Sequence, residues 1–167
     1  MTAADPFDGL LTGDMDEWLA ALPAYQRQSI AALLGDHDAV DVATIWLENS
    51  GPKDTAPFGG VRTAANNFYD NILRELQKAI CGGDEYAAER KALAEATKGG
   101  GKLLLVGALS TAIAPHVGAA AAVIGPAVAI TLGIVTNAGT ATACQALDDL
   151  ITRRSASASA EKSADGE

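Results

Sequence analysis

The sequence predicts an all-α protein in which an N-terminal helical bundle precedes an Ala/Gly-rich apolar helical hairpin. Apolar residues recur at three- and four-residue spacing in the front half, and residues 103–147 contain no Asp, Glu, Lys or Arg. Gly and Pro fall between these patterns, where helices end. We expect five consecutive segments: a flexible N-terminus (1–13), an acidic helical domain (14–98), a Gly-rich joint (99–102), an apolar hairpin (103–151) and a disordered tail (152–167).

The first two helices are predicted from their end signals. Asp14, followed three residues later by Glu17, resembles a capping box that opens a short helix. Pro23 ends this helix and can begin the next, over residues 23–34, with Gly35 as its terminator. Together they predict a helical hairpin.

Three further helices complete the expected front half. Asp38 can cap a helix that contains Val42, although residues 40–45 also alternate loosely as a strand would. Residues 49–60 predict a loop, and residues 65–79 show the clearest amphipathic helix, with Asp70 and Arg74 spaced to pair on its outer side. Residues 84–98 predict a helix that leads to the glycine joint.

The uncharged stretch contains a stripe of small residues when it is drawn as one continuous helix. Such a stripe lets another helix backbone approach closely. We expect it to form helix contacts or an oligomer interface through Gly118, Ala122, Gly125, Ala129 and Gly133. Polar residues that could line a pore are His116, Thr136, Asn137 and Thr140.

Two environments remain open for residues 103–147. In a bilayer, two spans would divide near Gly125 and Pro126, and Lys or Arg at positions 98, 102, 153 and 154 would place both ends in the cytoplasm. Val, Ile and Leu are balanced by Gly, Pro and polar residues, so insertion energetics are marginal. The alternative is that the hairpin forms the buried core of a helical module.

Composition and cysteine content limit the functions further. The net charge of −9 makes nucleic acid an unexpected partner, because phosphate binding needs clustered Lys and Arg. The acidic N-terminus does not resemble a secretory signal, which predicts a cytoplasmic N-terminal domain. Cys81 and Cys144 are expected to be reduced, separately packed side chains instead of a redox pair.

No pattern predicts catalysis, a cofactor or a metal. The run Gly99-Gly100-Gly101-Lys102 lacks the upstream Gly, the following Ser or Thr and the preceding strand of a phosphate-binding loop. Asp36, His37 and Asp38 are adjacent residues that cannot all face one ion. We therefore expect a protein that is not an enzyme and name no catalytic residue.

The leading functional hypothesis is a membrane-associated protein that oligomerises through its Gly/Ala-rich helix. It could form a pore in the inner membrane, with a cytoplasmic sensing or binding domain. The alternative is an all-α protein–protein interaction module. The expected partners are a second copy of the chain and a protein bound by the N-terminal helices, with a membrane as a third possibility.

Overall fold

The protein is all-α over the part that the structure describes. A computed structural model describes residues 13–50, 60–82, 86–88, 91–92, 95, 101–136 and 143–164, with the backbone alone at residues 50, 60–65 and 157–164. The helices are α1 (Met15–Leu19), α2 (Ala24–Leu34), α3 (Ala39–Ser50), α4 (Gly60–Cys81), α6 (Gly101–Val117), α7 (Ala121–Thr136) and α8 (Ala143–Ala164).

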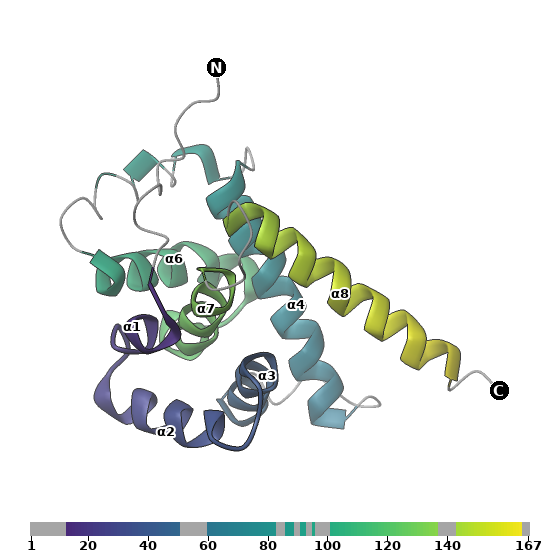
Figure 1. Ribbon diagram of the computed structural model, residues 1–167. Coiled ribbons are helices and arrows are strands. Elements are labelled where there is room, and N and C mark those ends of the chain that lie inside the picture. The colour runs from purple at the N-terminus through teal and green to yellow at the C-terminus, as the bar shows by residue number, and fades with distance from the viewer. Residues whose placement is uncertain are drawn as a thin grey trace.

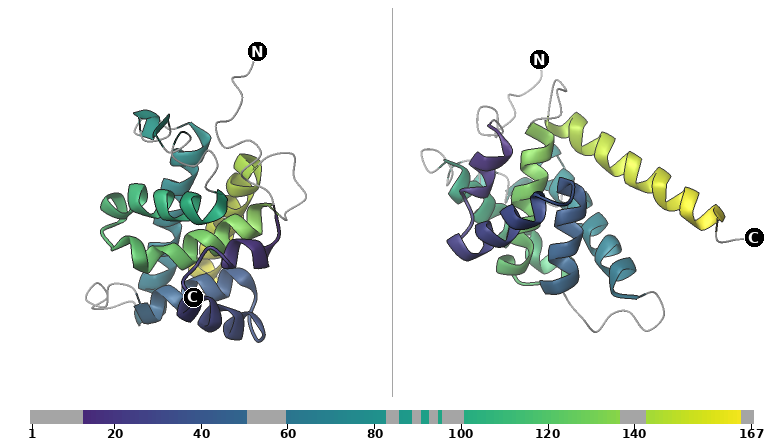
Figure 2. Two further views of the ribbon diagram at one scale, coloured as in Figure 1. Left: turned by 90° about the vertical axis from the view of Figure 1, so that its left-hand side faces the viewer. Right: turned by 60° about the horizontal axis from the view of Figure 1, so that its bottom comes forward.

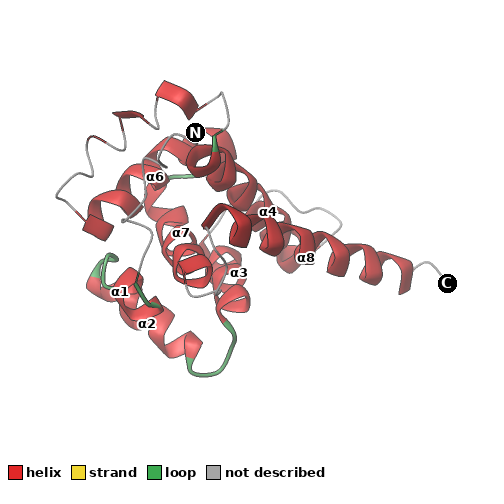
Figure 3. Cartoon of the chain, turned by 45° about the horizontal axis from the view of Figure 1, so that its top comes forward, coloured by secondary structure: helices red, strands yellow, loops and turns green. Residues whose placement is uncertain are grey.

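The predicted caps of the first helices are confirmed. Asp14 Oδ1 accepts a hydrogen bond of 2.9 Å from the Glu17 backbone N–H at the start of α1. The Glu17 carboxylate does not complete the box, because it pairs with Lys102 at 3.3 Å. Helix α2 begins directly after Pro23 and ends before Gly35, and the connections on either side of it are short (Figure 3).

Residues 40–45 lie in helix α3 and not in the strand that their alternating pattern also allowed. Asp38 Oδ1 accepts from the Asp41 N–H at 2.9 Å, and Val42 is fully buried. The predicted loop over residues 49–60 begins too early, since α3 continues to Ser50. Residues 51–59 lie outside the described part of the chain.

Helix α4 confirms the amphipathic pattern but corrects its expected ion pair. Its inner side carries fully buried Tyr69, Ile72, Leu73, Leu76 and Ala79. Asp70 does not pair with Arg74 within the helix. Its carboxylate lies 2.6 Å from Arg154 Nε of α8, where a tertiary partner replaces a local one.

The apolar hairpin turns earlier than the two-span division predicted. Helix α6 ends at Val117, Gly118 has φ of 74°, and α7 leaves at an angle of 117° to α6. The left-handed backbone at Gly118 is the conformation that terminates a helix most readily at glycine. Gly125 and Pro126, where the two-span arrangement would divide, lie inside α7. The continuous helix drawn through Gly118 is therefore wrong.

Helix α7 lies at the centre of the protein. It contacts α1, α2, α3, α4, α6 and α8, and Figure 1 shows it enclosed by its neighbours. Every residue from Ile124 to Gly133 is buried. Such a helix is apolar on all sides because protein covers all its sides.

Helix α8 corrects the expectation of a disordered tail from residue 152, because the helix continues to Ala164. Its first half lies along α4, and its far end projects from the helical body (Figures 1 and 2). Ala is the strongest helix former, and it alternates with Ser in this tail. The absence of large apolar residues therefore predicts that this tail does not pack against the core, but it does not exclude a helix.

Candidate functional site

Side chains from α2 and α3 compensate for a proline within α7. Pro126 has no N–H for the carbonyl of Ala122, four residues earlier, which would otherwise accept a helical bond. Gln26 Nε2 of α2, itself 5% exposed, donates to that oxygen at 3.2 Å. Trp46 Nε1 of α3 donates to the next carbonyl, Val123 O, at 2.8 Å. The start of α7 is thus fixed by two neighbouring helices.

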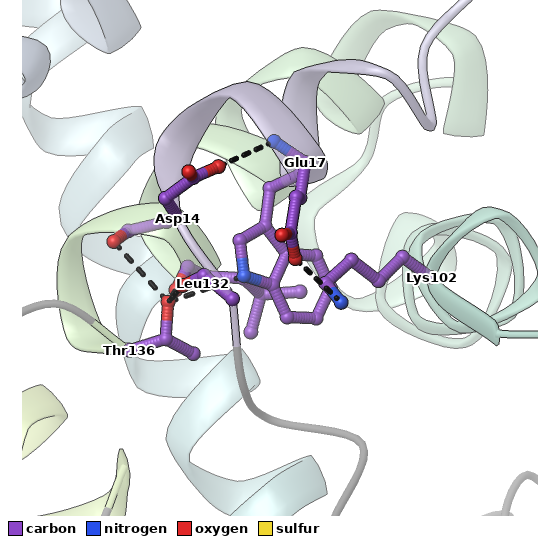
Figure 4. Close-up of polar contacts among 8 residues, drawn as sticks. Asp14, Glu17, Lys102, Leu132 and Thr136 are labelled. Carbon is purple, nitrogen blue, oxygen red and sulfur yellow. Dashed lines mark hydrogen bonds and ion pairs between the residues drawn. The ribbon is translucent and has the colours of Figure 1, made fainter.

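The other end of α7 is fixed by α1. Trp18 Nε1 donates to Thr136 Oγ1 at 3.1 Å, and this hydroxyl lies within donating distance of Leu132 O (2.8 Å) and Gly13 O (3.0 Å). Figure 4 shows these groups together, beside the Glu17–Lys102 ion pair. The Lys102 ammonium also lies 5.2 Å from the Trp18 ring centroid. This cluster connects α1, α6 and α7.

A buried polar pair crosses from α4 to the middle of α7. The hydroxyl groups of Tyr69 and Thr131 lie 2.8 Å apart, and Thr131 Oγ1 also donates to Ala127 O at 2.7 Å. Burial disfavours the tyrosinate and raises the pKa of Tyr69 from 10.0 to about 12. The hydroxyl therefore stays neutral at physiological pH and serves as a hydrogen-bonding group.

The small residues predicted as helix contacts meet neighbours within the chain or none at all. A Cβ at Gly133 would lie 2.6 Å from Met15 Sδ and 3.3 Å from Met15 Cα. One at Gly125 would lie 3.8 Å from Ser110 Oγ, whereas Gly118 has open space. Ala129 is fully buried and Ala122 is exposed. The structure does not bring the five residues onto one free surface.

The predicted pore-lining residues that the structure describes lie in different surroundings. Thr136 belongs to the α1 cluster, and His116 is exposed in the last turn of α6. Asn137 and Thr140 lie outside the described residues. The His116 ring lies 4.8 Å from that of buried Tyr86, whose hydroxyl donates to Glu75 Oε2 at 2.6 Å. No sequence signal linked these three residues, because their contact depends on tertiary packing.

The outer side of α6 is the uncharged surface that the hairpin leaves exposed. We define the α6 outer face as the exposed residues Leu103, Leu104, Gly107, Thr111 and Pro115. Among the described residues, Leu103 and Leu104 are two of the three exposed large apolar side chains, at 64% and 48% exposed. The sequence placed all five in the apolar stretch but gave no signal to separate an exposed face from a buried one.

The two cysteines form a disulfide, which corrects the expectation of separate reduced side chains. Cys81 ends α4 and Cys144 is the second residue of α8, with Cα atoms 5.7 Å apart across 63 positions of sequence. Disulfides are typical of oxidising compartments. The cytoplasmic expectation rests on the acidic N-terminus and stays a prediction.

The described residues supply no group of three or more His, Cys, Asp or Glu side chains arranged to hold a metal ion. Asp36, His37 and Asp38 are exposed in the turn between α2 and α3. Among the described helices, none alone has the length and apolar character to cross a bilayer, while α6 and α7 taken as a bent pair do. No protein-family model, curated protein or solved structure matches the chain.

Proposed function

We propose that the protein is a helical protein–protein interaction module whose uncharged hairpin forms its own core. The observation that carries this proposal is the continuous burial of Ile124 to Gly133 by helices of the same chain. Burying a Val, Leu or Ile side chain stabilises a fold by about 1.5–3 kcal/mol, so moving α7 elsewhere would sacrifice the main apolar core. The small residues of α7 then serve close packing within one chain.

The contact surface in this proposal is the α6 outer face. Its exposed leucines, one glycine and lack of charge suit another apolar helix, which can approach most closely at Gly107, where a Cβ would meet nothing within 4 Å. Exposed apolar side chains that gather on one face are typical of binding surfaces. Self-association through the buried α7 stripe would require the N-terminal helices to move away.

Fractionation without detergent tests the proposal. We expect folded protein in the high-speed supernatant, with an oligomer size or partner affinity that changes in Leu103→Glu/Leu104→Glu. Lys91→Glu is the matched control, because Lys91 is exposed on another segment. Recovery of the protein in the membrane pellet alone would contradict the interaction module. Equal association by the two variants would contradict the α6 outer face as its contact surface.

A membrane-active protein that stores its hairpin under α1, α2 and α3 is the second candidate. It is favoured by the length and composition of the α6–α7 pair. In this case the protein would release a trapped dye from vesicles, whereas the interaction module predicts no dye release.

A further inference from the structure

We infer that the Cys81–Cys144 disulfide is a reducible clip that holds α8 on α4, and that an external thiol attacks it at Cys81. The bond connects the last residue of α4 with the second residue of α8. It therefore closes one end of the contact between these two helices. The proposal is independent of the proposed binding role of α6.

Few of the α8 side chains that the structure describes are buried against the helical body. The fully or largely buried ones are Ala146 and Leu147, while Leu150 and Ile151 are half-buried. Asp148 accepts a weak 3.5 Å hydrogen bond from Gln77, and Arg154 forms the strongest polar contact, with Asp70. In contrast, α7 is buried along most of its length. Local opening begins in elements with few buried contacts, so α8 is the element that reduction can release.

The exposure of the two residues favours Cys81 over Cys144 as the one that a thiolate reaches. The Cys81 residue is exposed, whereas Cys144 is half-buried where α8 begins. Attack on Cys81 Sγ expels the Cys144 sulfur as a thiolate. That leaving group lies in the first turn of α8, where the helix dipole stabilises negative charge.

The charged side chains that the structure describes near the disulfide do not reverse this direction. Lys78, one turn before Cys81, is paired with Glu75 at 3.3 Å. Asp148, one turn after Cys144, is oriented toward the Gln77 amide. The carbonyl end of α4 at Cys81 carries partial negative charge, which disfavours departure of a thiolate from that position.

The chemistry is thiol–disulfide exchange with a small or protein thiol. The first thiolate forms a bond to Cys81 Sγ, the Cys81–Cys144 bond breaks, and its electron pair leaves on Cys144 Sγ. A second thiolate then attacks the mixed disulfide and frees Cys81 as a thiolate. Two thiols supply the two electrons, become one disulfide, and leave the two cysteines reduced.

Two measurements on the full-length protein test the clip. Glutathione is added briefly, free thiols are alkylated, and peptides are mapped by mass spectrometry. We expect glutathione on Cys81 and alkylation on Cys144 to exceed the reverse pattern about five-fold or more. Equal labelling or preference for Cys144 would overturn the direction of attack.

Hydrogen exchange with and without dithiothreitol tests the release of α8. Reduction should accelerate exchange in residues 143–154 about ten-fold or more, while α7 stays protected. The reduced parent should show the same exchange as the double variant Cys81→Ser/Cys144→Ser. Comparing the oxidised and reduced parent gives a result even if that variant does not fold. Unchanged exchange in α8, or equal loss of protection in α7, would show that the bond is not a local clip.

Discussion

Gln26 donates a hydrogen bond of 3.2 Å to the carbonyl of Ala122, which Pro126 leaves without its helical N–H partner. Gln26 and Ala122 are 96 positions apart in the sequence. A proline in a helix interior ordinarily costs about 3 kcal/mol, partly through the lost backbone bond. Here a side chain from α2 replaces that bond, so an internal proline is compatible with the central helix.

This relationship predicts coupling between Gln26 and Pro126. Gln26→Met should destabilise the protein by about 1–2 kcal/mol, because the Ala122 carbonyl loses the partner of a part-buried hydrogen bond. Pro126→Ala restores a backbone N–H that can donate to the Ala122 carbonyl, so in that background Gln26→Met should cost about 1 kcal/mol less. Chemical denaturation of the four proteins measures the cycle. Additive effects would mean that Gln26 does not compensate for the proline.

The small residues of the hairpin should respond differently to an added methyl group. Gly133→Ala should destabilise by about 1–3 kcal/mol, because the new Cβ meets Met15, including its Cα at 3.3 Å. Gly107→Ala should stabilise by about 0.5–1 kcal/mol, since its Cβ enters open space on a helix. Thermal unfolding of the two variants compares them directly. The same sign for both would contradict close packing of α1 on α7.

Alkaline pH should weaken the fold through Tyr69. Its pKa rises from 10.0 to about 12 on folding, chiefly through burial, so the folded state keeps a proton that the unfolded state loses. The stabilisation is complete below pH 10 and is lost as pH rises toward 12, by about 2–3 kcal/mol. Denaturation of the parent beside Tyr69→Phe at several pH values isolates this effect. Parallel pH profiles would refute it.

The attachment of α8 to α4 should depend on Arg154 and not on Arg74. Arg154 pairs with Asp70 at 2.6 Å, with both side chains under one-third exposed, and its guanidinium lies 4.7 Å from the Tyr69 ring centroid. A double-mutant cycle of Arg154→Ala and Asp70→Ala should give a coupling of about 1 kcal/mol. Arg74→Ala, the control, should change stability by less than about 0.5 kcal/mol. A larger coupling energy between Asp70 and Arg74 than between Asp70 and Arg154 would show that Asp70 pairs within α4 instead.

Local signals predicted the helices well, because caps and periodicity act over three or four residues. Asp14, Asp38 and the apolar side of α4 behave as their spacing predicts. Contacts between distant segments were not predictable in this way. The Arg154–Asp70 pair and the disulfide depend on how α8 lies along α4, and proximity in space left no periodic mark in the sequence.

The candidate site was less predictable than the fold for the same reason. The stripe through Gly118 assumed one continuous helix, whereas the chain turns there and places Gly125 and Gly133 against different neighbours. An uncharged helix has the same sequence pattern in lipid and in a protein core. The two environments differ in how much of the helix surface the rest of the chain covers, and this depends on tertiary structure.

Native-state hydrogen exchange in detergent-free buffer tests directly whether α7 is the core of the folded chain. We predict that amides from Ile124 to Gly133 exchange more slowly than those of α2 and α8, and open only with global unfolding. Added lipid vesicles should leave this pattern unchanged. Rapid exchange of these amides in buffer, with protection gained only on vesicles, would show that α7 is not the core of the protein in solution.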